Sequence, residues 1–266
     1  DLISQAAECT RHKKSADSRL HNHFLGAMVL NLSHTALSQV PVVEVIDGQQ
    51  RLMTLQVLLA ALKDETAFIE NPYLKADLER LTTNRGPLAN PDEIYKVWPT
   101  SALQDHVRNV MDAGSSNELV DRYKGLHKFR YKRWEPPRPS LMEAYLFFAS
   151  AVKKFLSKDD EDLPLELLSF PAAKRAEVLI EALIWNIQMV TIELEADDDA
   201  QVIFETLNAR GEPLTPSDLV RNFIFLTAAR QDLDVSQLYS EQWRQFEEEP
   251  PHQPFWKQEE RQGRIK

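Results

Sequence analysis

The residues best suited to phosphate chemistry form one short run from Asp47 to Arg51, with the sequence DGQQR. A segment rich in β-branched residues ends at Asp47, Gly48 turns the chain, and a helix with regularly spaced leucines follows. The first amides of a helix lack intrahelical acceptors and attract anions, and an arginine fork binds phosphate oxygens. Asp47 would hold Mg²⁺ or a water molecule, or orient Arg51. The run therefore predicts a phosphate site.

The glycines decide which kind of phosphate site this would be. None of the seven lies near another, so the P-loop and the dinucleotide-binding GxGxxG motif are both absent from the sequence. A single glycine, Gly48, must then let the backbone approach the phosphate, while the helix N-terminus supplies the positive field.

The same run has a second interpretation that needs no ligand. Asp47 would be the N-cap of the helix, and Gln50, at the third helical position, would complete a capping box. Spacing alone leaves both interpretations open.

A basic segment is the candidate DNA surface of an otherwise acidic chain. The formal net charge is −10, which argues against a protein that coats DNA non-specifically. Residues 122–138 nevertheless contain seven basic residues and one acid, a net +6, so the remainder carries −16. Aromatic residues between the cations complete a mixture that stacks bases and binds phosphates. The expected DNA contacts are Lys128, Arg130, Lys132 and Arg133; the alternative is a solvated loop with aromatic anchors.

The elements that position these residues indicate an α+β fold with few strands and many helices. Residues 42–46 and 188–194 have strand patterns, and helices are predicted over 52–63, 103–111, 140–156 and 172–185. The leucines of the helix that follows Arg51 predict one buried face. Residues 72–99 predict short helices and loops, and further helices are expected after residue 197 and from residue 215. The stretch 24–32 is apolar with Gly26 inside it and is assigned to no element.

The composition limits which cellular compartments and which kinds of metal site fit this chain. A single cysteine, Cys9, excludes an internal disulfide and a multi-cysteine zinc site, and it fits a reducing compartment. Apolar stretches such as 145–152 are too short to span a bilayer, and no signal-peptide pattern precedes the first helix. His21 and His23 lack a nearby carboxylate or cysteine, so a metal site there is disfavoured. We expect a cytoplasmic protein.

Two long motifs resemble one known family. Residues 45–55, VIDGQQRLMTL, look like the signature of the DGQQR family, whose founders include the GmrSD-type restriction enzymes. Residues 204–222, FETLNARGEPLTPSDLVRN, are similar to that family's FETLN-x-RG segment and the S-x-DL-x-RN helix that follows it. Weaker similarities to the family are FLGAMVL at 24–30, WPT at 98–100 and EAYLFF at 143–148. The matches are collinear and extend from about Leu2 to Asn222.

The resemblance implies a ParB-like small mixed sheet with extensive helical insertions and a nucleotide pocket linked to NTP hydrolysis. It implies that the nucleotide is bound by Gly48, Gln49, Gln50 and Arg51, that Asp47, Gln50 and Arg51 are catalytic, and that Asp47 is the metal ligand. The resemblance also implies that five residues of the second motif lie close to this nucleotide pocket: Asn208, Arg210, Asp218, Arg221 and Asn222. For these, solvent-facing charge and, at Asp218, a helix cap remain alternatives.

The resemblance also implies the organisation of the chain and its partners. The expected regions are a nucleotide-binding core over 1–66, a helical insertion over 67–187, a return to the core over 188–230, and a C-terminal helical segment or linker over 231–266. Family members begin with an IPxYQRxYxW-like segment, and some end in an HNH nuclease domain. Neither pattern is found here, and His252 is the only histidine after Asn222. We therefore expect a fragment.

The expected function is nucleotide turnover that controls recognition or cleavage of modified foreign DNA in a restriction or antiphage system. The cofactors would be an NTP (GTP, ATP or another) and Mg²⁺ or another divalent metal. The partners would be DNA and a nuclease domain or partner subunit, with a homo-oligomer left open. One alternative is a non-catalytic nucleotide or DNA sensor that regulates a nuclease, and another is a helical scaffold with a relic pocket.

Overall fold

The computed structural model describes residues 2–14, 22–32, 40–86, 88–99, 103–126, 138–157, 163–194, 220, 224–225, 227–228 and 233–243. The chain divides into two compact units, residues 1–195 and 196–266. The expected boundaries at 66/67, 187/188 and 230/231 stay predictions.

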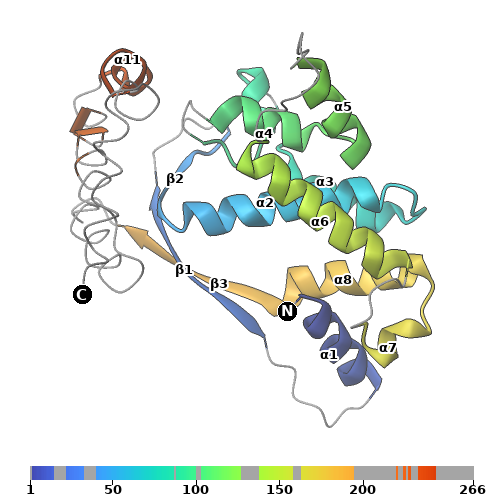
Figure 1. The fold of residues 1–266 in the computed structure, drawn as a ribbon. Coiled ribbons are helices and arrows are strands. Elements are labelled where there is room, and N and C mark those ends of the chain that lie inside the picture. Colours follow the sequence, from blue (N-terminus) through green and yellow to red (C-terminus); the bar gives the residue numbers. More distant parts are fainter. Residues whose placement is uncertain are drawn as a thin grey trace, which may run out of the picture. The chain divides into compact units, whose positions relative to one another are not determined.

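The first unit contains a mixed three-stranded sheet in the order β2-β1-β3 (Figure 1). Strand β1 spans His23–Leu32, β2 spans Val43–Asp47 and β3 spans Ile187–Leu194. The central strand β1 pairs antiparallel with β2 and parallel with β3. The two strands expected from sequence are thus confirmed, but they are the outer pair. The strand between them is the apolar stretch that the sequence left unassigned.

Helices supply most of the other described residues of this unit. The longer ones are α1 (Leu2–Lys14), α2 (Gln49–Glu65), α3 (Pro72–Thr82), α4 (Gln104–Met111), α5 (Ser116–Leu126), α6 (Ser140–Ser157) and α8 (Ala172–Asn186). Two short turns complete the set, the 3₁₀ helix η1 (Pro91–Ile94) and α7 (Leu165–Leu168). The helices predicted over 52–63, 103–111, 140–156 and 172–185 are confirmed to within a few residues at their ends, and the small mixed sheet among them confirms the α+β class. The helices expected after residue 197 and from residue 215 stay predictions, because most of their residues lie outside the described ones.

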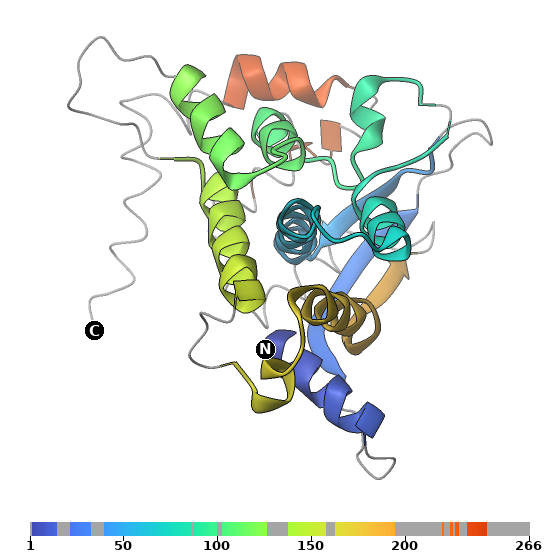
Figure 2. The ribbon, with the colours of Figure 1, turned by 90° about the vertical axis from the view of Figure 1, so that its right-hand side faces the viewer.

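Helix α2 lies at the centre of the helical layer, on the same side of the sheet as α3 and α8 (Figures 1 and 2). Its residues Leu59 and Leu62 join an apolar cluster with α1, α3, α7, α8 and the C-terminal part of α6. Its residues Val57, Ala60 and Ala61 join a different cluster with α4, α5 and α6. The sequence predicted a single buried face, but α2 buries two because helices cover it on more than one side.

A tyrosine hydroxyl links α6 to α2 inside the second cluster. Tyr145 is fully buried, and its hydroxyl donates to Asp64 Oδ2 at 2.6 Å. Burial raises the pKa of Asp64 above its ordinary value, an effect that the Tyr145 hydrogen bond opposes.

The described part of the second unit contains a short helix, α11 (Val235–Leu238), followed by a single π-helical turn, η3 (Tyr239–Trp243). Asp234 Oδ1 accepts from the Gln237 amide at 3.0 Å and so caps α11. The Phe225 ring packs on Tyr239 and Trp243, with centroids 6.1 and 5.7 Å away. Among the described helices of either unit, none is long and apolar enough to cross a membrane.

A buried guanidinium ties three helices of the first unit together. Arg175 of α8 is 2% exposed. Its Nε donates to the Phe155 carbonyl at 2.9 Å, its Nη2 to Leu156 and its Nη1 to Phe170, which follows α7. Burial lowers the pKa of Arg175. The last carbonyls of a helix have no intrahelical donor, so one side chain satisfies the C-terminus of α6.

We expect Arg175→Met to lower the free energy of unfolding by roughly 2–4 kcal/mol, because it leaves buried carbonyls without a donor. The control is Lys174→Met. That neighbouring ammonium lies on the surface and forms an i,i+3 pair with Glu177 at 2.8 Å, so its loss should cost less than about 1 kcal/mol. Urea unfolding measures both variants. Equal losses would show that Arg175 contributes no more than a surface cation.

Candidate functional site

The DGQQR run forms the turn between β2 and α2. Strand β2 ends at Asp47, and Gly48 adopts the left-handed region at φ +94° and ψ +8° as the N-cap of α2. The Leu52 amide donates to the Gly48 carbonyl at 3.0 Å and closes the first helical turn. No side chain caps this helix. The capping interpretation of Asp47 and Gln50 is therefore wrong, because Gly48 holds the cap position and Asp47 lies one residue before it.

Packing in the free protein already requires a glycine at residue 48. A β-carbon at this residue would lie 3.2 Å from Met28 Cγ and 3.4 Å from Met28 Cα, on the central strand β1. Side chains also rarely adopt a φ of +94°. The missing side chain therefore lets the turn pack closely against β1, and the close approach to phosphate that the sequence predicted stays a prediction.

Asp47 and Arg51 form an ion pair across the first turn of α2. Arg51 Nη2 donates to Asp47 Oδ2 at 3.0 Å, with side chains 37% and 25% exposed. The Arg51 side chain also lies over Gly26 of β1. The guanidinium is thus partly exposed and held in place, and its present partner is a carboxylate on the neighbouring strand.

Two irregularities in the sheet lie next to this ion pair. Pairing between β1 and β2 shifts between Val29↔Asp47 and Leu30↔Val45, so Ile46 is an extra residue just before Asp47. Pairing between β1 and β3 shifts between Phe24 and Ala27, the interval that contains Gly26. Bulges redirect side chains and are frequent beside functional sites. Here one lies before the carboxylate and the other lies at the glycine beneath Arg51.

The two glutamines of the run differ in their surroundings. Gln49 Nε2 donates to the Val45 carbonyl at 2.7 Å, so this side chain folds back onto the end of β2. Gln50 is exposed, and its backbone carbonyl accepts from the Thr54 hydroxyl at 2.7 Å. Gln49 stabilises the turn, whereas Gln50 presents its amide to solvent.

The remaining predicted site residues lie outside the described residues. They are Asn208, Arg210, Asp218, Arg221 and Asn222 of the second motif, and Lys128, Arg130, Lys132 and Arg133 of the basic segment. His21 and the side chain of Cys9 also lie outside them.

The residues at the turn fit a divalent cation that is held jointly with a ligand. Mg²⁺ is commonly bound through one or two carboxylates together with substrate phosphates, and Asp47 provides one such carboxylate. In the described part of the chain, no group of three or more His, Cys, Asp or Glu side chains could enclose a metal. A cation at Asp47 would therefore take its other ligands from nucleotide and water.

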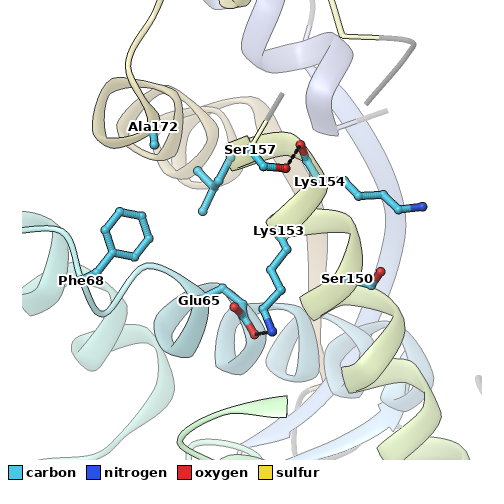
Figure 3. Close-up of a pocket in the computed structure, with 8 residues that line it drawn as sticks. Glu65, Phe68, Ser150, Lys153, Lys154, Ser157 and Ala172 are labelled. Carbon is cyan, nitrogen blue, oxygen red and sulfur yellow. Dashed lines mark hydrogen bonds and ion pairs between the residues drawn. The ribbon is translucent and has the colours of Figure 1, made fainter. Parts of the chain in front are cut away.

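A hollow of about 570 Å³ lies elsewhere, at the opposite end of α2 (Figure 3). Glu65, the last residue of α2, pairs there with Lys153 at 3.2 Å. A 17-residue helix places that end roughly 25 Å from the Asp47 turn. Lining residues are Glu65, Phe68, Ser150, Lys153, Lys154, Leu156, Ser157 and Ala172. This hollow is therefore not part of the DGQQR site.

We expect Gly48→Ala to lower the free energy of unfolding by about 2–3 kcal/mol, because the methyl group adds both backbone strain and a tight contact with Met28. The control is Gly86→Ala, where φ is +117° and no atom lies within 4 Å, so only the backbone strain of about 1 kcal/mol remains. Urea unfolding measures the difference. If both variants lose the same stability, the Met28 contact does not require glycine.

Comparison with known proteins places the chain in a family. A family model described as the GmrSD restriction endonuclease, N-terminal domain, matches residues 3–225. This range includes both motifs and the described elements of the first unit, from the second residue of α1 to the end of β3. A search of curated proteins gave no match. The chain belongs to the family of GmrSD restriction endonuclease N-terminal domains, and with it to the restriction and defence proteins.

Proposed function

We propose that this chain binds and hydrolyses a nucleoside triphosphate at the turn from Asp47 to Arg51. Turnover would control recognition or cleavage of modified foreign DNA by a nuclease domain or partner subunit. The observation that carries the proposal is one turn that combines an uncapped helix N-terminus, a partly exposed guanidinium and a carboxylate.

The helix end supports the binding of phosphate. Helix α2 has 17 residues, no side-chain cap and no acidic residue in its first turn. The aligned peptide dipoles give such an end a partial positive charge, which acidic residues or caps usually offset. Gln49 and Gln50, the first two residues of α2, are exposed, so a phosphate oxygen is a suitable acceptor for the first amides.

The ion pair supports an exchange of partners on binding. Arg51 is paired with Asp47 in the free protein. A phosphate would take the guanidinium, because an arginine fork binds phosphate oxygens well. Asp47 would then be released to hold the divalent cation that accompanies the nucleotide. Asp47 would thereby hold a cation whose chemistry, when bound, would be to neutralise phosphate charge during attack by water.

Gln50 is the residue of the turn best placed to contact water. Its side chain is exposed, while that of Gln49 is engaged with the Val45 carbonyl. An amide can orient an attacking water without ionising. We therefore keep Asp47, Gln50 and Arg51 as the catalytic set.

The proposal extends to residues outside the described ranges on sequence grounds alone. Arg210 and Arg221, with Asn208, Asp218 and Asn222, would complete the nucleotide site. Lys128, Arg130, Lys132 and Arg133 would contact DNA, since positive charge must be local in a chain of net charge −10. Nucleotide turnover measured with and without modified DNA separates this function from that of a sensor that binds without hydrolysis.

We expect Arg51→Ala to weaken nucleotide binding at least tenfold while the free energy of unfolding changes by less than about 1 kcal/mol. A charge-assisted phosphate contact contributes about 1.5–3 kcal/mol, whereas an exposed ion pair contributes little to stability. Titration with a fluorescent nucleotide measures the affinity. The control is Arg80→Ala in α3, whose guanidinium also pairs with a carboxylate nearby in sequence, Asp77 at 3.4 Å. Unchanged affinity in Arg51→Ala would exclude Arg51 as a phosphate ligand.

We expect Asp47→Asn to separate the contribution of the metal to nucleotide affinity from that of the phosphate contacts. The neutral amide competes less for Arg51, so metal-free nucleotide should bind at least as tightly as to the unaltered protein. The gain in affinity on adding Mg²⁺ should disappear, and turnover should be lost. Titrations with EDTA and with Mg²⁺ measure this, with Asp77→Asn as the control carboxylate. An Asp47→Asn protein that keeps its Mg²⁺ response would rule out Asp47 as the metal ligand.

A further inference from the structure

Gly26 is an unusual residue for the middle of a central strand. It lies within β1 at φ +105°, a conformation that L side chains rarely adopt. It also lies in the interval where the pairing of β1 with β3 shifts register. A glycine inside a strand weakens it and commonly marks a bulge or a close approach of other atoms.

The close approach at Gly26 is made by Arg51. A β-carbon on Gly26 would overlap Arg51 Nη1 and would lie 3.6 Å from Cζ and 4.0 Å from Cδ. The three atoms nearest to that added carbon all belong to this one side chain. The guanidinium therefore occupies the space that a side chain on β1 would fill.

Two strands hold the guanidinium from different directions. Gly26 of β1 leaves room beside Nη1, and Asp47 at the end of β2 accepts from Nη2 at 3.0 Å. A free arginine side chain loses rotamer entropy when it is ordered. A side chain that is already confined loses less when a ligand binds, which strengthens binding.

We propose that Gly26 is a positioning residue of the nucleotide site. Its missing side chain forms a slot in the central strand that holds the Arg51 guanidinium beside the first amides of α2. One phosphate then meets the amides and the guanidinium together. This inference rests on the proposed function, and Gly26 acts on the ligand only through Arg51.

The test is a double-mutant cycle on nucleotide affinity with Gly26→Ala, Arg51→Ala and the double variant. Gly26→Ala should weaken binding tenfold or more, close to the effect of Arg51→Ala, because the methyl group displaces the guanidinium. The double variant should bind as Arg51→Ala does, since the slot then has nothing to hold. Gly86→Ala imposes a similarly unfavourable positive φ with open space around it, and should bind as the unaltered protein does.

The outcomes distinguish this inference from the function on which it rests. Unchanged affinity in Arg51→Ala would overturn the proposed function itself. Loss in Arg51→Ala without loss in a folded Gly26→Ala would overturn only the slot. A further loss in the double variant would show that Gly26 acts on the strand and not through Arg51, which also overturns the slot.

Thermal unfolding decides the case in which Gly26→Ala alone does not fold. Removal of the Arg51 guanidinium in the double variant removes the overlap, so the double variant should recover the Tm of Gly86→Ala. A double variant that stays unfolded would overturn the slot, because the glycine would then be needed for the strand alone.

Discussion

The contact between Gly48 and Met28 is the constraint on which the rest of the first unit depends. Because Gly48 has no side chain, the chain can leave β2, turn and start α2 directly against the central strand. Helix α2 then runs between two apolar clusters and supplies buried residues to both. A larger residue at the turn would move the start of the helix that joins the sheet to the two clusters.

The same constraint concentrates polar groups at one end of α2. The left-handed glycine takes the N-cap position, so no side chain caps the partly positive end of the helix, whose first two residues are exposed. Asp47 is left free to pair with Arg51 one turn later. The proposed nucleotide site thus lies at a turn whose geometry is set by the packing of Gly48 against β1.

The two ends of α2 have different surroundings. At its C-terminus, Glu65 pairs with Lys153 and accepts from the Ser116 hydroxyl at 2.9 Å, so its charge is satisfied within the protein. At its N-terminus, Gln49 and Gln50 are exposed, and the Asp47–Arg51 ion pair is partly exposed. Buried charges need internal partners, whereas a binding site needs groups that can exchange theirs. This difference favours the DGQQR turn over the hollow near Lys153 as the place where a ligand binds.

The sequence by itself determined the features that depend on neighbouring residues. The β-branched run before Asp47, the leucine spacing of α2 and the order of the two motifs were sufficient for the turn, most helices, the α+β class and the family. Tertiary structure alone decided that residues 23–32 form the central strand and that Gly26 lies beneath Arg51. Helical periodicity and turn chemistry are local, whereas strand pairing and close approach require partners far apart in the chain. A continuous apolar stretch around one glycine therefore carried no signal of its position until β2 and β3 were placed on either side of it.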